Sequence, residues 1–480
     1  MGRGRSRAAD AREEELSASL ARVREQLSSS EAADTLAGVL ARGCEAAALD
    51  TFAAEVRAGA EAHGRAAPAA AAAAAVAGAL VLDVRSPGEY ARGHVPGARS
   101  LPLFSDEERA EVGTVFKREG RDTALRLGLT FVGPELARLV DFVREHTETA
   151  TEEVMVYCLQ GRMRSGSVAW LLRHAGFSNV RTVAGGYKAF RTWALERFSD
   201  TLPKKVTDGV DENGGEEGGE REGGEEPGAS QRDSEMAEEP NMNRRPQPRV
   251  CIVGGRTGSG KTRVLEELRR HGAQVIDLEG LANHKGSAFG WVGMDPQPTS
   301  EHYQNLLASE WAGLDPEKWV YIEDEGSHVA ACTLPQALYT RMREAPVVAA
   351  LDVPREVRLA HIVADYAADA FRADPGWEAR MVKSVEALRK KLGHERTAMC
   401  LSALESGDYR YVGEQVLGHY DRRYDTHTFS GSGGGDGTGA RVGRIITVEG
   451  FAGEDGMLDC GRAAQDVLAA VNASEIERVM

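Results

Sequence analysis

The sequence has few cysteines and no long hydrophobic run. Its six cysteines are scattered through 480 residues without the paired spacing of a disulfide framework or a zinc site, which suits a reducing compartment such as the cytoplasm. The Ala-rich stretch 66–80 is weakly hydrophobic and is interrupted by Pro68 and Gly78, so we expect no membrane span. The N-terminus carries a few arginines but soon meets several acids, so an organelle address stays open and unsupported.

An excess of positive charge is also missing, because the formal net charge is −16. From Asp208 to Glu239, however, thirteen acidic residues and two arginines give a local charge of −11, so the rest of the chain carries only −5. The acidity is therefore concentrated in one segment, and basic faces that bind a polyanion remain compatible with the composition elsewhere.

The length of the chain predicts two or three domains. We expect the acidic segment to be a disordered linker, because it has too few apolar residues to offset the entropy lost on ordering, and to hold its neighbours only loosely in register. The predicted division is a low-complexity helical leader at 1–75, an α/β domain at 76–200, the linker at 201–248, a second α/β domain at 249–350 and a helical C-terminal region with a Gly-rich insertion at 351–480.

The most informative stretch of the first domain surrounds Cys158. Residues 154–158 have the apolar pattern of a short buried strand, and residues 166–173 have the spacing of a helix. A loop between a strand end and a helix start directs backbone N–H groups toward one point, which stabilises a thiolate. A small buried residue is the alternative for Cys158, but the polar loop around it favours a reactive thiol.

Residues 80–198 resemble the rhodanese family. The resemblance rests on the motifs at 83–90, 93–98 and 183–187 together with the Cys158 loop. It implies a small α/β domain with a parallel sheet, in which the loop cysteine carries a transferable sulfur as a persulfide. In contrast to His94, which we expect to tie backbone groups together in a tight turn, Cys158 is the candidate for chemistry.

Five residues separate Cys158 from Arg164, a spacing that also matches the cysteine phosphatases. The rival interpretation is therefore a phosphatase in which Arg164 clamps a phosphate through two parallel hydrogen bonds. No Asp is placed as an obvious general acid for that reaction. The polar, helix-compatible insertion at 108–128 receives no role from its composition.

The second domain opens with a phosphate-binding loop. Residues 249–254 read as a strand and residues 263–268 as a helix, which is the context that such a loop requires. Its glycines let successive N–H groups cradle a di- or triphosphate, Lys261 neutralises the outer oxygens and Thr262 can bind Mg²⁺. The predicted phosphate-binding residues are Gly255, Arg256, Thr257, Gly258, Ser259, Gly260, Lys261 and Thr262.

Two further segments accompany this loop. The apolar run 318–322 ends in Glu323 and Asp324, either of which would hold Mg²⁺ or its waters, although an acidic cap at a strand end is the plainer alternative. We predict Thr262 and Asp324 as the metal ligands. The segment 277–290 is rich in small residues and carries His284, Lys285 and Ser287, which suits it to close over an anion or a nucleobase.

The order of these motifs, together with segments 277–290, 297–300 and 108–128, resembles the tRNA 2-selenouridine synthase family over residues 80–198 and 250–427. The expected fold is α/β: a rhodanese-like parallel-sheet domain and a P-loop NTPase-like domain with a helical C-terminal part. The resemblance implies conversion of a wobble 2-thiouridine to 2-selenouridine with selenophosphate, through an S-geranylated intermediate made from geranyl diphosphate. One visible departure is Arg162, where a second glycine is expected after Gly161.

The resemblance also distributes the roles. Cys158 would carry selenium as a perselenide while Arg164 and the loop amides hold the oxyanion of selenophosphate, and the P-loop would hold the diphosphate leaving group. The implied partners are tRNA and an enzyme that supplies selenophosphate. Basic residues form a weaker prediction of tRNA backbone contacts, with a plain solvated face as the alternative: Lys285, Arg380, Lys383, Lys390 and Lys391.

Two rival functions remain open from the sequence. One is a fused sulfurtransferase and P-loop kinase that acts on a small molecule without RNA. The other is a regulatory binding protein with a phosphatase-like loop. Binding of tRNA at low salt would argue against the sulfurtransferase–kinase fusion. Turnover of a phosphate ester would indicate a phosphatase and argue against the regulatory binding protein.

Overall fold

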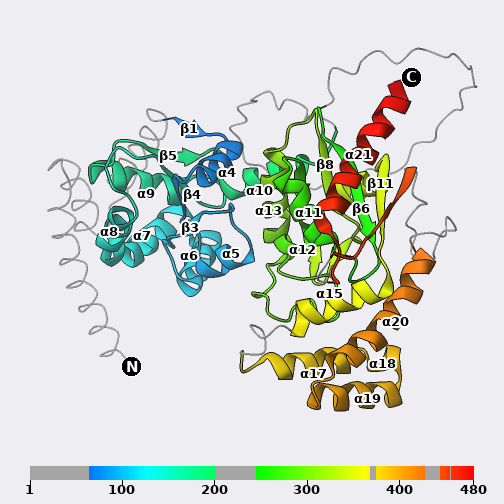
Figure 1. Ribbon diagram of the computed structural model, residues 1–480. Coiled ribbons are helices and arrows are strands. Elements are labelled where there is room, and N and C mark those ends of the chain that lie inside the picture. Colours follow the sequence, from blue (N-terminus) through cyan, green and yellow to red (C-terminus); the bar gives the residue numbers. More distant parts are fainter. Residues whose placement is uncertain (1–63, 201–244, 368–373, 428–443, 454–455, 480) are drawn as a thin grey trace, which may run out of the picture.

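The computed structural model describes residues 64–200, 245–367, 374–427, 444–453 and 456–479, which form two α/β domains in contact with each other (Figure 1). Most of the expected leader, most of the acidic linker and the Gly-rich insertion lie outside the described residues. No helix in the described ranges is long and apolar enough to cross a membrane.

The first domain is a five-stranded parallel sheet in the order β1-β5-β4-β2-β3. It begins before the expected boundary at 76, because β1 already pairs with β5. Its elements are β1 (Arg65–Ala66), α4 (Pro68–Val76), β2 (Leu80–Asp83), α5 (Pro87–Arg92), β3 (Arg99–Ser100), α6 (Asp106–Glu119), α7 (Arg121–Val132), a 3-10 turn (Gly133–Glu135), α8 (Leu136–Glu145), β4 (Val154–Tyr157), α9 (Met163–His174), β5 (Val180–Val183) and α10 (Gly186–Glu196).

Strand β4 lies at the centre of this sheet and is buried on both faces. Because side chains alternate along a strand, Val154 and Val156 face the core beneath α8 and α9, whereas Met155 and Tyr157 face α4 and α10. This double burial explains the continuous apolar run in the sequence and fixes the end of β4, where Cys158 follows.

The second domain is also a five-stranded parallel sheet, in the order β12-β11-β6-β8-β7. Its elements are β6 (Arg249–Gly255), α11 (Lys261–Arg270), β7 (Gln274–Ile276), α12 (Leu278–Leu281), α13 (Ser300–Ala312), β8 (Trp319–Glu323), β9 (His328–Val329), β10 (Cys332–Thr333), α14 (Gln336–Arg343), β11 (Val347–Asp352), α15 (Arg355–Ala367), α17 (Trp377–Ala387), α18 (Arg389–Leu392), α19 (His394–Glu405), α20 (Tyr409–His427), β12 (Arg444–Glu449) and α21 (Cys460–Val479).

The sheet of the second domain extends beyond the expected boundary at 350. That boundary falls inside β11, and the helices α15 to α20 come between β11 and β12 in the chain. Strand β12 then pairs with β11 along its whole length, and α21 packs on α11. The segment expected to be a helical C-terminal region therefore also completes the sheet that carries the P-loop.

The two domains pack against each other through α10 and α13 (Figure 1). Phe190 and Phe198 of the first domain share one buried apolar cluster with Tyr303 and Trp311 of the second, and the rings of Phe198 and Trp311 lie 5.5 Å apart. The expectation that the linker holds the two domains only loosely in register is wrong, because their surfaces pack together. The composition of a linker carries no information about the surfaces of the domains that it connects.

Candidate active sites

The Cys158 loop runs from the end of β4 to the start of α9, as the sequence predicts. Gly161 has φ +62°, and a Cβ there would lie 2.5 Å from the carbonyl oxygen of Val183. Only glycine fits this position. Arg162, in contrast, has φ −111°, so its side chain is tolerated where a second glycine was expected, and it is exposed.

The Cys158 sulfur is nearly buried, with 3% of the residue exposed. Burial by itself disfavours the thiolate, but it is outweighed by the Ser165 hydroxyl, the positive charge of Arg164 and the backbone N–H groups of Ser165 and Arg162, so the pKa of the thiol is lowered. The Ser165 Oγ lies 3.4 Å from Sγ. The loop therefore favours a nucleophilic sulfur, and its amides face that sulfur as the strand-loop-helix pattern predicts.

Arg164 is held by a residue that the sequence did not single out. Its Nη1 lies 3.1 Å from Oε2 of Glu89, which Arg109 also approaches, with its Nε at 3.3 Å. Glu89 in turn accepts from the backbone N–H of Ser86 in the capping box that starts α5. Although burial alone would raise the pKa of Glu89, Arg164 and Ser86 lower it, so the carboxylate stays charged and fixes the guanidinium beside the loop.

The predicted His94 contact to backbone is present, since His94 Nδ1 lies 3.0 Å from the carbonyl oxygen of Tyr90. The ring has a second role that the sequence did not indicate. It stacks on Tyr90 at 3.8 Å and lies 3.9 Å from the ring of His302 in the second domain. His94 therefore belongs to the contact between the domains.

The second candidate site is the loop between β6 and α11. The strand and helix lie where the sequence predicts them, and Gly258 and Gly260 have φ of +78° and +76°. Lys261 Nζ donates to the carbonyl oxygen of Gly255 over 3.1 Å. Ser259 Oγ is buried and has no partner among the described residues. Loop amides and an orphaned hydroxyl gathered at a helix start fit a phosphate.

Carboxylates collect beside Lys261, at the end of β8 and on α12. Glu323 is buried, and its Oε1 accepts from the backbone N–H of Glu279 over 2.7 Å. Burial and the Glu279 carboxyl raise the pKa of Glu325 to about 8, against the opposing charge of Lys261. Burial also raises the pKa values of Glu279 and Glu323. The sequence missed Glu279 and Glu325 because the chain brings them together only in the folded sheet.

This carboxylate cluster fits Mg²⁺ in part. Oε2 of Glu323 is buried without a partner, and a cation would offset the repulsion that raises the neighbouring pKa values. No group of three metal-ligating side chains occurs in the described residues. That is compatible with Mg²⁺, which usually takes one or two protein carboxylates together with waters and phosphate oxygens. Asp324 is half-buried, and its backbone N–H pairs with the carbonyl oxygen of Val253.

The segment 277–290 lies between the P-loop and the helices α15 and α20. Lys285 Nζ donates to the carbonyl oxygen of Asp365 over 3.2 Å, and burial lowers its pKa. Ser287 Oγ lies 2.9 Å from the hydroxyl of Tyr366, and the backbone N–H of Ala288 donates to the hydroxyl of Tyr420. Lys285 therefore lies near the P-loop rather than with the other predicted basic residues.

Those other residues lie on α17 and α18 (Figure 1). Lys390 and Lys391 are exposed, Lys383 lies over the ring of Trp291 at 5.2 Å, and Arg380 pairs with Asp374. These four cations therefore lie on two consecutive helices, and Lys285 lies elsewhere.

One helix connects the Cys158 loop to the second domain. The backbone N–H of Tyr187, at the start of α10, donates to the carbonyl oxygen of Cys158 over 2.9 Å. The Tyr187 hydroxyl donates to Oε1 of Glu301 in α13 over 2.6 Å, and Arg191 Nη1 donates to Oδ1 of Asn305, also over 2.6 Å. Helix α10 therefore contacts the Cys158 loop at its start and α13 along its side.

A cysteine loop on a rhodanese-like sheet and a P-loop on a second parallel sheet, joined in one chain, define a two-domain α/β protein. Residues 67–192 match the family model of the rhodanese-like domain, and residues 248–425 match that of the tRNA 2-selenouridine synthase AAA domain. The chain belongs to the tRNA 2-selenouridine synthase family, and it is an enzyme of that family.

The curated relatives support this assignment over most of their length. The tRNA 2-selenouridine synthase of Marinobacter nauticus is 31% identical over 72% of this chain and 87% of its own length. That of a Sulfurovum species is 33% identical over 66% of this chain and 76% of its own length.

Two solved structures are also similar. The N-terminal domain of an ATP/GTP binding protein from Clostridium difficile 630 is 36% identical over 24% of this chain and 89% of its own length, with a TM-score of 0.23. A rhodanese-like domain from an Anabaena species is 18% identical over 34% of this chain and 98% of its own length, with a TM-score of 0.18.

Proposed function

We propose that this enzyme converts 2-thiouridine at the tRNA wobble position to 2-selenouridine with selenophosphate, through an S-geranylated intermediate made from geranyl diphosphate. The observation that carries the proposal is a cysteine of lowered pKa beside an arginine, in the same chain as a P-loop. The first suits the activation of an oxyanion-bearing chalcogen donor, and the second suits a diphosphate.

The geranylation step belongs to the P-loop. The eight residues from Gly255 to Thr262 hold the diphosphate of geranyl diphosphate, and Lys261 stabilises the charge that develops on it as it leaves. The uridine sulfur takes the geranyl group. If Mg²⁺ were bound, Thr262 with Glu323 or Asp324 would hold it, and it would supply neutralisation of diphosphate charge.

The selenation step belongs to the Cys158 loop. The Cys158 thiolate engages selenophosphate, while Arg164 and the loop amides bind its oxyanion. Overall, the C2–S bond of the geranylated uridine breaks, a C2–Se bond forms, and the P–Se bond of selenophosphate is hydrolysed to phosphate. Geranylthiol leaves with the proton, so the exchange requires no net oxidant or reductant.

The wider assignments follow from this chemistry. The tRNA backbone binds to the exposed cations of α17 and α18, and Lys285 contacts the reacting end of the substrate near the P-loop. An enzyme that makes selenophosphate is the expected upstream partner, because the donor is labile. The cytoplasm is the expected compartment, which agrees with five free cysteines among the described residues.

A phosphatase is the second candidate, favoured by the five-residue spacing between Cys158 and Arg164 and by the hydroxyl of Ser165 next to the sulfur. Turnover of an aryl phosphate that depends on Cys158, at a rate above that of selenium exchange, would favour this alternative. If both reactions depend on Cys158 and selenium exchange is much faster than aryl phosphate turnover, the loop is assigned to selenophosphate.

Mass spectrometry of wobble nucleosides tests the main proposal. Thiolated tRNA incubated with the enzyme and geranyl diphosphate should gain the mass of a geranyl group, and addition of selenophosphate should replace S-geranyl by selenium. Omission of geranyl diphosphate should prevent selenation. If selenium enters the nucleoside at full rate without any geranyl donor, the intermediate in this proposal is wrong.

A further inference from the structure

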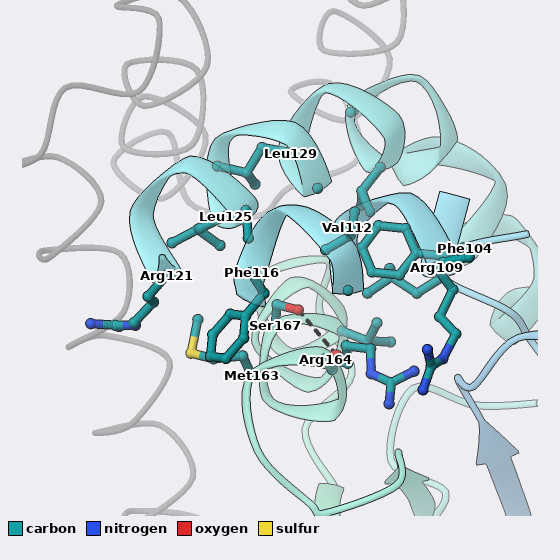
Figure 2. Close-up of a pocket in the computed structure, with 18 of the residues that line it drawn as sticks. Phe104, Arg109, Val112, Phe116, Arg121, Leu125, Leu129, Met163, Arg164 and Ser167 are labelled. Atoms are coloured by element: carbon teal, nitrogen blue, oxygen red, sulfur yellow. Dashed lines mark hydrogen bonds between the residues drawn. The ribbon is translucent and has the colours of Figure 1, made fainter. Parts of the chain in front are cut away.

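The rhodanese-like domain contains a cavity of about 840 Å³ between α6, α7 and α9 (Figure 2). Its volume falls within the roughly 300–1,000 Å³ of small-molecule sites in proteins. Figure 2 shows the side chains that line it, and most of them are apolar: Phe104, Val112, Phe116, Leu125, Leu129 and Met163. Phe116 is 58% exposed, which is unusual for so large an apolar side chain. Helices α6 and α7 contain the insertion at 108–128, to which the sequence analysis gave no role.

The cavity has polar residues at its edge. Arg109, Lys117, Arg121 and Arg164 contribute to its lining, and two of them, Arg109 and Arg164, pair with Glu89. Arg164 is also the cation beside the Cys158 sulfur. Its presence in both sites means that the cavity adjoins the Cys158 loop. The lining therefore suits a ligand with an apolar body and an anionic attachment.

The cavity found beside the P-loop is much smaller. A cavity beside the P-loop, lined by Thr257, Phe289 and Tyr366 among others, has a volume of only about 30 Å³. That is room for about two or three water molecules, since each needs roughly 10–15 Å³ of such space. Of these two cavities, the one beside the Cys158 loop alone has space for a branched ten-carbon chain.

We infer that the α6–α7–α9 cavity binds the geranyl chain of the S-geranylated tRNA uridine during selenation, and this inference rests on the proposed function. The geranyl chain enters the apolar interior, and the exposed Lys117 and Arg121 at the edge contact tRNA phosphates. Because the cavity adjoins the Cys158 loop, a chain held there keeps the C2–S bond near selenophosphate and retains geranylthiol as it leaves. The occupant is thus the geranylated nucleoside rather than free geranyl diphosphate.

Gly113 offers a sharp test, because it lines the cavity from within α6. A Cβ added there meets only Nη1 of Arg109, at 3.7 Å, so a larger side chain enters the cavity without a clash at its base. Leucine is also a better helix former than glycine, so Gly113→Leu should fold. Gly418→Leu is the matched control, since Gly418 lies on α20 and a Cβ there meets nothing within 4 Å.

The assay compares selenium exchange on two short RNAs that carry S-geranyl or S-methyl 2-thiouridine. Wild type and Gly418→Leu should prefer S-geranyl RNA by at least about tenfold in kcat/KM, which is the discrimination that an apolar pocket commonly gives. Gly113→Leu should lose this preference while its rate on S-methyl RNA and its geranylation of thiolated tRNA stay unchanged. A wild-type preference in Gly113→Leu would overturn the inference.

Binding separates the inference from the function on which it rests. By fluorescence anisotropy, wild type should bind S-geranyl RNA at least about tenfold more tightly than unmodified RNA, and Gly113→Leu should bind both equally. Tight binding without selenium exchange would overturn the proposed function and support the cavity assignment. Loss of geranyl diphosphate binding in Gly113→Leu, with S-geranyl RNA binding intact, would overturn the choice of the nucleoside as occupant.

Discussion

At the scale of single residues, the sequence predicts the positions of the candidate groups better than the contacts around them. Cys158 lies at the end of a strand and Lys261 at the start of a helix, each beside its own loop, so local spacing predicts both positions. Ser165 was visible only as part of a polar loop, and its hydroxyl is the closest side-chain oxygen recorded at the sulfur. Glu89 and Glu325 act on residues that are distant in sequence or across the sheet, and no local pattern reveals that.

The separate roles of Cys158 and Lys261 give the first prediction. Cys158→Ala should reduce selenium exchange by at least about a hundredfold, because no thiolate remains, while geranylation stays within a factor of about two. Lys261→Ala should do the converse, and should still exchange selenium when S-geranyl tRNA is supplied. Nucleoside mass spectrometry measures both steps in one digest.

Cys400→Ala is the matched control for the cysteine substitution, since Cys400 is buried in α19 and burial raises its pKa. It should retain both activities. Loss of both steps in Cys158→Ala would contradict the division of labour between the two domains.

The carboxylate cluster gives a prediction of pH dependence. The pKa of Glu325 is raised from near 4.5 to about 8, so the folded protein holds a proton that the unfolded chain has released between these pH values. Stability is therefore highest below pH 4.5 as far as this group is concerned, and falls as pH rises toward 8. Glu325→Gln should flatten this decline, measured as the thermal midpoint at several pH values from 5 to 8.

Glu310→Gln serves as the control, because Glu310 is an exposed glutamate on α13. It should follow the wild-type decline. An equal slope in wild type and Glu325→Gln would show that the Glu325 carboxyl does not hold a proton in the folded state.

At the scale of elements, the sequence predicts strands and phosphate loops well because their signals are continuous in the chain. The strand before Cys158 and the strand before the P-loop are buried on both faces, which gives unbroken apolar runs. Strand β12 is different. Its sequence contains the β-branched run Ile445–Val448, but the helices α15 to α20 separate it from β11 in the chain, and no local pattern shows that the two strands pair. The helices α6 and α7 had a helical pattern, but only the folded structure shows the cavity between them.

The Cys158 loop gives a prediction at this scale through Gly161. Gly161→Ala should destabilise the first domain by about 1–3 kcal/mol, because φ is positive and the added Cβ meets the carbonyl oxygen of Val183. The loop should open to relieve this contact, so selenium exchange should fall strongly. Denaturant unfolding and the exchange assay measure the two effects.

Gly176→Ala separates the contact from the backbone strain. Gly176 also has a positive φ, of +102°, but a Cβ there meets nothing within 4 Å. This variant should lose some stability and keep its exchange activity. If the two substitutions reduce exchange equally, the close approach of Val183 to the loop is not what shapes the site.

At the scale of the whole molecule, the docked domains were the feature furthest from prediction. Their contact uses pairs that are more than a hundred residues apart in the chain, such as Tyr187 with Glu301 and Arg191 with Asn305. The acidic linker between them suggests independence, yet the buried cluster is continuous across the boundary. Under the proposed function, this arrangement holds the two sites that act on one uridine in a single body.

Arg191 tests whether that docking matters for the two-step reaction. Arg191 donates to Gln304 and Asn305 of α13, and Asn305 is fully buried, so Arg191→Ala leaves its Oδ1 without this donor. Such a loss costs about 1–3 kcal/mol, and here it falls on the contact between the domains. Each step should keep its rate on supplied substrate, whereas conversion of thiolated tRNA should release more of the S-geranylated intermediate.

The measurement is the ratio of S-geranyl to selenated wobble nucleosides during one incubation, which should rise several-fold in Arg191→Ala. Arg181→Ala is the control, because Arg181 pairs with Glu153 inside the first domain and contributes no recorded contact to α13. An unchanged ratio in Arg191→Ala, with measurably weakened docking, would mean that the intermediate moves between the sites through solution. A raised ratio in both variants would instead trace the effect to the stability of the first domain.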